Sequence, residues 1–341
     1  NAFAFKLTEP ISLDGILDEE IWEDQEGWNG NFRQYFPSDT STSQINTRVK
    51  VAFDDNNLYL AAVMENNGPR KYVSTSLRRD FRGEQNDAIV FVFDTFNDKT
   101  NAFSFGVNPY GVQREGLIAN GGNRSEDFSL AWDNKWYSQA KIFENHWQVE
   151  IVIPLSTLRF NEGAQNWNVN FYRIDSHYGE RSTWSPIPRN FPVISTAFLR
   201  KLIFEEPLRK STANISLIPY VAGRTNTNFL ENTSESLTPA IGGDAKIGIG
   251  PALNLDLTFN PDFSQVEVDQ QVTNLDRFEI FFPERRQFFL ENADLFESFG
   301  QPRSRPFFSR RIGVDIDSAT GQNVQSKIIY GARLSGKLNE N

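Results

Sequence analysis

The first 205 residues consist of short runs in which hydrophobic and polar side chains alternate. Within 47–64, Val49 and Val51 alternate with polar or small residues, a polar turn follows at 54–57, and the alternation resumes on the return. A period of two residues is typical of half-buried strands, and a polar turn between two such runs predicts a hairpin. Similar runs occupy 87–107, 141–154 and 166–175. Because helical periodicity is almost absent, the pattern predicts an antiparallel β-sandwich over 1–205.

The pattern changes near residue 205, where a charged, proline-containing stretch at 204–212 is typical of a linker. Beyond it, two segments alternate strictly, at 244–263 and 326–341. In the first of them, apolar residues occupy the odd positions from Ile247 to Phe259, and small or polar residues occupy the even positions. We therefore treat 206–341 as a second region, made of a linker followed by about four strands.

Two architectures share this alternation. About ten residues with one apolar face are typical of a strand in an outer-membrane β-barrel, but a half-buried strand of a soluble sheet has the same period. The pattern alone favours the soluble sheet. A closed barrel needs about eight strands, so a barrel reading would also require further strands after residue 341.

Composition removes several classes of function. The formal net charge is -10 and the sequence contains no cysteine. An acidic surface repels phosphate backbones, so we expect no nucleic-acid partner. Without cysteine there are no disulfides, no cysteine-based zinc sites and no thiol nucleophiles. No long uncharged apolar run predicts a transmembrane helix, and any export signal would precede residue 1.

Nothing in the sequence predicts catalysis. The two histidines, His146 and His177, belong to no zinc-binding motif, and no G-x-S-x-G elbow is present. The chain has 44 acidic residues, and none of them stands out as a pair for glycoside hydrolysis. We therefore predict a protein that is not an enzyme.

Two blocks of sequence resemble a known family. Between residues 9 and 205, "ISLDGILDEEIW", "VAFDDNNLYLAAVM", "NDAIVFVFDTFND" and "WQVEIVIPLSTLRF" come in the order found in family 9 carbohydrate-binding modules. The second block runs from "LTFNPDFSQVEVD" through "NLDRFEIFFPERRQFFLEN" to "FFSRRIG". Together they resemble Gram-negative outer-membrane proteins of undefined function, in which such a module precedes a C-terminal β-barrel.

The resemblance implies a sandwich followed by the first strands of an outer-membrane β-barrel, with the sandwich in the periplasm or at the cell surface. It also implies a sugar site formed by two tryptophans, a glutamate, an arginine and an asparagine. The corresponding positions here are near Glu84 and Phe191 for the tryptophans, then Val90, Gly106 and Asn108. Because only Asn108 matches, we expect any sugar site to have moved.

Sugar binding requires flat aromatic faces together with planar polar groups. We expect Trp147 and Trp167 to be buried, because they alternate with core positions in their strands. The residues predicted to form a relocated carbohydrate site are Phe81, Asn108, Trp132, Trp136, Trp184 and Phe191.

Calcium is the other ligand that the resemblance implies. Asp94, Asn97 and Asp98 supply oxygen atoms within one short turn, although such residues also cap turns with no ion present. The segment 274–292 combines arginine, glutamate and aromatic residues, and could be a plug, a docking surface or a salt-bridged turn.

The sequence therefore predicts an outer-membrane protein whose carbohydrate-binding-like module binds glycans or docks partners. Two alternatives stay open. One is a structural subunit of a larger outer-membrane assembly that binds no sugar, and the other is an accessory region of a glycoside hydrolase.

Overall fold

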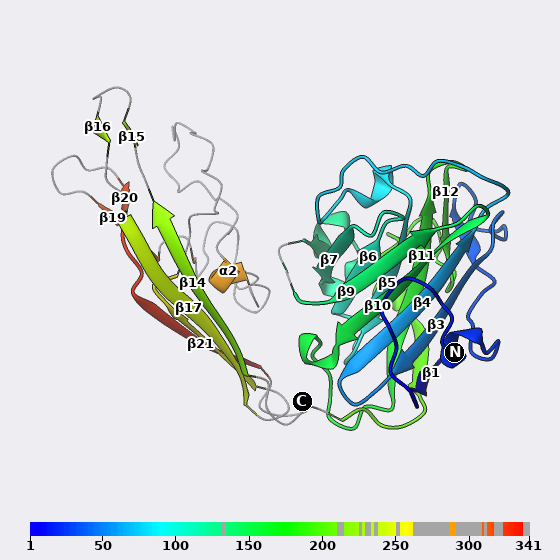
Figure 1. The fold of residues 1–341 in the computed structure, drawn as a ribbon, viewed down its shortest axis with the longest axis horizontal. Coiled ribbons are helices and arrows are strands. Elements are labelled where there is room, and N and C mark those ends of the chain that lie inside the picture. The colour runs from blue at the N-terminus through cyan, green and yellow to red at the C-terminus, as the bar shows by residue number, and fades with distance from the viewer. Residues whose placement is uncertain are drawn as a thin grey trace. The chain divides into compact units, whose positions relative to one another are not determined.

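The computed structural model describes residues 1–130, 132, 134–209, 215–224, 227–228, 233–234, 238–249, 253–261, 287–290, 309, 312–316 and 323–336. The chain divides into two compact units, Asn1–Ser211 and Thr212–Asn341, here called unit 1 and unit 2. Both are built mainly from β-strands (Figure 1). Within the described part of the chain, every helix is too short to span a lipid bilayer.

Unit 1 is a continuous sheet folded into two facing layers (Figure 1). The first layer contains β8 (Phe128–Ser129), β7 (Gln113–Ile118), β6 (Ala102–Val107), β5 (Ala88–Asp94), β11 (Asn166–Asp175) and β13 (Arg200–Phe204). The second contains β1 (Ala2–Lys6), β3 (Thr47–Phe53), β4 (Asn57–Glu65), β10 (His146–Pro154) and β9 (Tyr137–Ile142). Strand β1 joins the layers, because it pairs in parallel with both β13 and β3. Strands β12 (Glu180–Thr183) and β2 (Arg33–Phe36) extend from β11.

Short helical turns connect these strands. They are α1 (Glu20–Glu23) and the 3-10 turns η1 (Gly83–Gln85), η2 (Asn120–Gly122), η3 (Ser125–Asp127), η4 (Leu155–Thr157) and η5 (Thr196–Phe198). Helix α1 and turn η4 fall within the two sequence segments without strand periodicity, "LDEEIW" and "PLSTLRF".

The core lies between the two layers and takes alternate residues from each strand. Leu58 and Leu60 of β4 and Val149 of β10 point into it and are fully buried. Trp147 and Trp167 are buried there too, as their strand positions predicted. The predicted β-sandwich is therefore confirmed, and its pairings are antiparallel apart from the two that β1 makes.

Each layer also has an outward face, and both outward faces are partly covered. Over the first layer, loops bury a second apolar cluster around Val90 and Tyr172. Over the second layer, residues 14–28, here called the strap, cover a third cluster around Trp22 and Tyr59.

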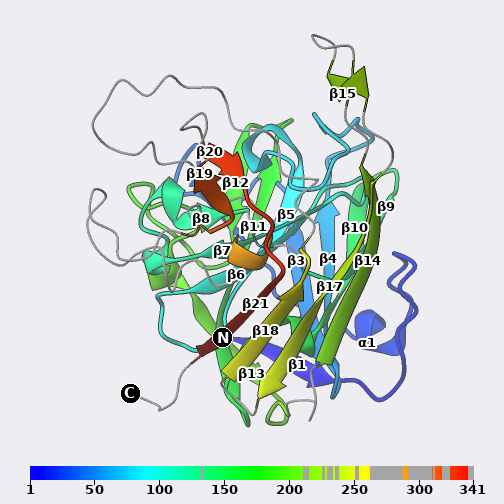
Figure 2. The same cartoon turned by 90° about the vertical axis from the view of Figure 1, so that its left-hand side faces the viewer.

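Unit 2 contains a four-stranded antiparallel sheet in the order β14, β17, β18, β21 within the described residues (Figure 2). Its strands are β14 (Ile215–Arg224), β17 (Thr238–Ile249), β18 (Leu253–Phe259) and β21 (Tyr330–Gly336). Two short strand pairs and one helix lie between these strands in the sequence. They are β15 (Thr227–Asn228) with β16 (Thr233–Ser234), β19 (Val314–Ile316) with β20 (Asn323–Gln325), and α2 (Gln287–Leu290).

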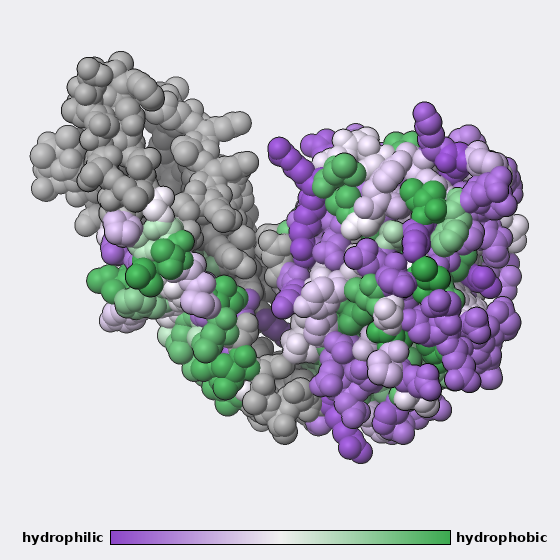
Figure 3. Space-filling view, in the orientation of Figure 1, coloured by the Kyte–Doolittle hydropathy of each residue, from purple (hydrophilic) through white to green (hydrophobic). Residues whose placement is uncertain are grey.

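The pairing register places the apolar positions of all four strands on one face. One row across the sheet is Ile215, Ile247, Leu255 and Leu334. Several members of this face are exposed, namely Ile215, Leu217, Val221, Ile241, Ile249, Phe259, Tyr330 and Leu334. Figure 3 shows hydrophobic residues gathered over the described strands of this unit. The alternation predicted from sequence is thus confirmed.

The opposite face of this sheet is polar and covered. The Arg333 guanidinium donates to Asp256 Oδ2 at 2.7 and 3.1 Å, and both side chains are largely buried. Phe288 of α2 packs on the Arg333 guanidinium and its carbonyl accepts a bond from Arg333 Nη1 at 2.7 Å. Of the predicted segment 274–292, only this helix is described. On this polar face Asp256, Thr258 and Ser335 are buried, whereas Ile218 at its edge is exposed.

Candidate functional site

The sugar-site position implied by the resemblance is filled by packed side chains. Val90 of β5 and Gly106 of β6 lie opposite each other on the outward face of the first layer. Phe81, Tyr172 and Ile194 bury this face, together with Val90 itself. A Cβ atom at Gly106 would already lie 3.2 Å from Val90 Cγ2. No room for a sugar ring exists at these positions.

The aromatic residues predicted as a relocated site do not share one accessible surface. Trp132 and Trp136 do come together, because both pack against Phe105 with ring centroids 5.7 and 5.3 Å apart. Trp136 is buried and Trp132 is packed against the core. Trp184 is buried against Phe171. Trp136 and Trp184 therefore belong to the core, and Trp132 packs on it while partly exposed.

The other three predicted residues are dispersed as well. Phe81 is buried in the cluster over the first layer. Asn108 is fully buried, where its Oδ1 accepts bonds from the backbone N–H groups of Tyr110 and Val112 and its Nδ2 donates to Ser74. Asn108 therefore shapes a turn. Phe191 stays partly exposed on a surface loop, with its ring against Phe198.

The residues predicted to bind calcium cap a turn. The Asp94 carboxylate is buried and accepts bonds from the backbone N–H groups of Asp98 and Lys99 and from Asn168. Asp98 Oδ1 accepts from two further backbone N–H groups, and Asn97 donates to the Asn166 carbonyl. Within the described ranges, no group of three or more acidic, histidine or cysteine side chains is placed to hold a metal ion.

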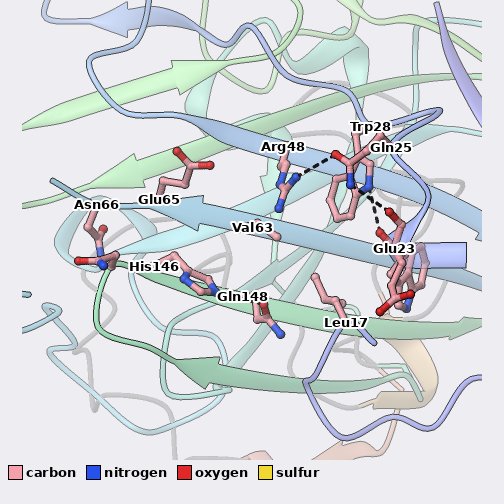
Figure 4. Close-up of a pocket in the computed structure, with 12 residues that line it drawn as sticks. Leu17, Glu23, Gln25, Trp28, Arg48, Val63, Glu65, Asn66, His146 and Gln148 are labelled. Atoms are coloured by element: carbon pink, nitrogen blue, oxygen red, sulfur yellow. Dashed lines mark hydrogen bonds between the residues drawn. The ribbon is translucent and has the colours of Figure 1, made fainter. Parts of the chain in front are cut away.

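An open groove of about 430 Å³ lies instead on the outward face of the second layer. Its floor is the row Arg48–Val63–Gln148, in which one residue comes from each of β3, β4 and β10. The neighbouring row adds Glu65 and His146, which are register partners. Figure 4 shows Arg48 and Gln148 on either side of Val63. The volume is within the range of small-molecule sites.

The strap forms one wall of this groove and is fixed by a buried carboxylate. Glu150 of β10 accepts bonds from Gly15 N at 2.8 Å, Asp14 N at 3.2 Å and Trp22 Nε1 at 3.0 Å. Burial outweighs these donors and raises the pKa of Glu150 to about 7. On the next strand but one, the buried Lys50 ammonium donates to the Asp24 carbonyl at 2.9 Å. Burial lowers the pKa of Lys50.

The strap positions one aromatic side chain at the end of the groove. Trp28 Nε1 donates to the Trp22 carbonyl at 3.2 Å, which fixes the orientation of the indole. The Arg48 guanidinium lies 4.8 Å from the Trp28 ring centroid and 3.5 Å from Gln25 Oε1 (Figure 4). The other wall is formed by the turns that contain Asn66 and Asn145.

The groove therefore combines an oriented indole, the apolar Val63 at the centre of its floor, and amide, carboxylate, imidazole and guanidinium groups around them. These groups can both donate to and accept from hydroxyls, and they include no nucleophile paired with a base. The arrangement is suited to holding a hydroxylated ligand, and it offers no evident chemistry.

Sequence reasoning missed this groove. His146, for which the sequence indicated no role, starts β10 and bonds Gln148 at 3.2 Å. The available signal was the set of polar residues at the outward positions of β3 and β10, namely Arg48, Lys50, His146, Gln148 and Glu150. That signal does not reveal which of these positions the strap covers.

Two family models match the chain. The family described as "Carbohydrate family 9 binding domain-like" matches residues 13–186, and a domain of unknown function (DUF5916) matches residues 211–332. No curated protein matches.

Solved structures similar to this chain include a family 9 carbohydrate-binding module from Caldicellulosiruptor kristjanssonii, in complex with cellotriose and in complex with glucose. The first is 18% identical with a TM-score of 0.43, and the match covers 62% of this chain and 95% of that one. The second is 17% identical with a TM-score of 0.42, over 62% and 98% of the two chains.

Proposed function

The chain belongs to the carbohydrate family 9 binding domain-like family, and from this we propose that unit 1 is a non-catalytic glycan-binding module whose ligand lies in the groove. The observation that carries the proposal is the oriented Trp28 indole beside the Arg48–Val63–Gln148 floor. Sugar rings bind through C–H groups on aromatic faces and through hydroxyls on planar polar side chains. The groove supplies both kinds of contact.

The filled position on the first layer supports this location. With Val90 buried beneath Phe81 and Ile194, a ligand could enter there only if a packed cluster were removed. Opening such a cluster would cost several kcal/mol, since each large side chain contributes about 1.5–3 kcal/mol when buried. The groove on the second layer needs no such rearrangement.

Trp28→Ala tests this proposal, with Phe191→Ala as the matched control. Phe191 is a partly exposed aromatic outside the groove and was itself predicted as a sugar contact from sequence. A glycan array would identify a ligand for the whole protein, and calorimetry would measure both variants. We expect Trp28→Ala to weaken binding about 10-fold or more and Phe191→Ala to leave it unchanged.

The reverse result would place the ligand near Phe191 and refute the groove. No binding across a broad array would favour the alternative in which unit 1 docks a protein partner and binds no sugar.

For unit 2, we propose that the four-stranded sheet is the beginning of an outer-membrane β-barrel, with unit 1 in the periplasm or at the cell surface. The exposed apolar face supports this, because its row Ile215–Ile247–Leu255–Leu334 contains no polar residue. Strands β14 and β17 have 10 and 12 residues, and a tilted membrane-crossing strand needs about 9–11. The buried Asp256–Arg333 pair on the other face fits a polar barrel interior.

Fractionation of a Gram-negative cell that exports the protein tests this proposal. We expect the protein to remain in the outer membrane after alkaline carbonate extraction and to need detergent for release. Release as a soluble monomer would contradict the barrel.

A further inference from the structure

Arg48 is the arginine that lines the groove. Its guanidinium lies against Trp28 and approaches Gln25 Oε1 at 3.5 Å. The Arg48 Nε atom is buried and has no hydrogen-bond partner. Among the described residues, no carboxylate forms an ion pair with Arg48. A cation is therefore held in the groove with most of its donors unused.

Three other arginines of this unit that lie against buried groups have carboxylate partners, whereas Arg114 packs on Phe128. Arg70 bonds both oxygens of Asp175 at 2.7 and 2.8 Å, and Arg173 bonds Asp175 at 2.8 Å. Arg79 pairs with the buried Glu115. A guanidinium removed from water is unfavourable unless an anion or several acceptors compensate for the lost hydration. For Arg48, the groove leaves that place open to a ligand.

We propose that the groove binds a glycan that carries an isolated carboxylate, as in a uronic acid residue, with this carboxylate on Arg48. This inference rests on the proposed glycan-binding function and names its ligand class. A planar guanidinium can bond both oxygens of a carboxylate, and such charge-assisted pairs are stronger than neutral hydrogen bonds. Trp28 holds the guanidinium in a fixed plane, so less freedom is lost when the ligand binds.

The rest of the groove fits the remainder of such a sugar. Arg48 and Gln148 belong to strands on either side of β4, so their backbones lie about 10 Å apart across Val63. A pyranose ring on Val63 with its carboxylate at Arg48 directs its far hydroxyls toward His146, beside the Gln148 amide that bonds Gly15 and His146. The ring face can also reach the Trp28 indole.

Two acidic side chains restrict the ligand further. Glu65 lies one row along from Arg48, and Glu23 belongs to the strap wall. Each can accept a hydrogen bond from a sugar hydroxyl, but each repels a second carboxylate on the ligand. The groove should therefore select a chain with isolated acidic residues over both a neutral chain and a dense polyuronate.

Calorimetry of the whole protein with matched oligosaccharides tests this selectivity. The probes are a xylo-oligosaccharide with one glucuronic acid branch, the same compound with its carboxyl reduced to the alcohol, and an oligogalacturonate. We expect the uronate-bearing compound to bind at least 10-fold more tightly than its reduced form and than the oligogalacturonate. Its affinity should fall with added salt, and that of the reduced compound should not.

Arg48→Gln and Arg48→Lys test the residue, with Arg78→Gln as the control at an exposed arginine outside the groove. Arg48→Gln should lower affinity for the uronate about 10-fold and leave the reduced compound within 3-fold. Arg48→Lys, which keeps the charge and loses the planar fork, should lie between. The reduced-carboxyl comparison needs no variant, so it decides the matter even if Arg48→Gln does not fold.

Equal affinity for the acidic and reduced compounds, or an equal loss of both in Arg48→Gln, would overturn the acidic-sugar inference and keep the glycan-binding proposal. Binding of no glycan at all would overturn both. Tighter binding of the oligogalacturonate would refute the preference for an isolated carboxylate.

Discussion

Raising the pH from about 5 to about 8 should weaken unit 1 through the single carboxyl of Glu150. This side chain lies beneath the strap, where burial raises its pKa from 4.5 to about 7, and the nearby Glu19 carboxylate acts in the same direction. The backbone N–H groups of Asp14 and Gly15 and the Trp22 indole lower the pKa, but they do not overcome burial. The folded state therefore favours the protonated acid.

The direction and size of the effect follow from this shift. Because the folded pKa lies above the unfolded one, the stabilisation by Glu150 is fully present below about pH 4.5 and is lost as the pH rises through about 7. The pKa of Glu150 rises by about 2.5 on folding, and at about 1.36 kcal/mol per pKa unit this corresponds to about 3 kcal/mol of unfolding free energy. Such a loss is a large part of a typical domain's stability.

Urea unfolding of the whole protein between pH 4.5 and 8.5, followed by tryptophan fluorescence, measures this effect. All seven tryptophans lie in unit 1, from Trp22 to Trp184, so the signal reports on that unit alone. Glu150→Gln cannot ionise and should remove about 3 kcal/mol of pH dependence. It should also be less stable at pH 5 by about 1–3 kcal/mol, because the amide turns one acceptor into a donor.

Glu144→Gln is the control, since Glu144 is exposed in the turn that precedes the same strand. Its pH profile should match that of the unchanged protein. Other buried carboxyls, such as Asp87 and Glu115, have raised pKa values as well, so the informative quantity is the difference between the two profiles. If Glu150→Gln kept the full pH dependence, the Glu150 carboxyl would not be the source of that dependence and this reasoning would be refuted.

Three further substitutions probe other parts of the chain. Val221 is 79% exposed on the apolar face of unit 2, and a charge on a lipid-facing strand costs about 2–4 kcal/mol. Val221→Lys should therefore prevent outer-membrane assembly in a fractionation assay. The control Leu77→Lys, at a side chain 74% exposed in unit 1, should have no effect. Arg173→Ala should destabilise unit 1 by about 3 kcal/mol in urea unfolding, because the guanidinium is buried but its partner Asp175 keeps a second arginine. Val90→Glu should cost about 3 kcal/mol or more and create no sugar binding in calorimetry, because the new carboxylate would be buried without a partner.

The sandwich could be predicted because its core imposes the sequence pattern directly. Each strand of β3, β4 and β10 buries one parity against the facing layer, so Val51, Leu60 and Ile151 are apolar in register. The apolar face of unit 2 could be predicted for the same reason, since its alternation survives in the pairing of Leu255 with Leu334. In both cases the signal is local to one strand.

The filled sugar position had a sequence signal that alternation alone does not use. Strand β5 reads AIVFVFD, so the positions between Ile89 and Phe93 are apolar on both parities. A strand that is apolar on both parities is covered on both faces. Val90 and Val92 are in fact buried in the cluster over the first layer, which leaves no place for a ligand there.

The groove could not be predicted from local pattern, because its wall comes from far away in the chain. Glu150 holds Gly15, which is 135 residues earlier, and Lys50 holds Asp24. In the sequence, Arg48 and Lys50 are equivalent outward positions of β3. Only the path of the strap makes one of them buried and the other open to the groove.

That path connects the stability of unit 1 with the ligand it can bind. The strap covers the row that contains Lys50 and Glu150 and also bonds Gln148 in the next row, where Arg48 keeps part of its surface open to the groove. In the covered row, protein groups compensate for the buried charges and burial shifts both pKa values. In the open row, no described carboxylate pairs with Arg48, so an anion from a ligand can take that place. The edge of the strap thus separates Lys50 and Glu150, whose charges are compensated within the protein, from Arg48, whose guanidinium can bind a ligand anion.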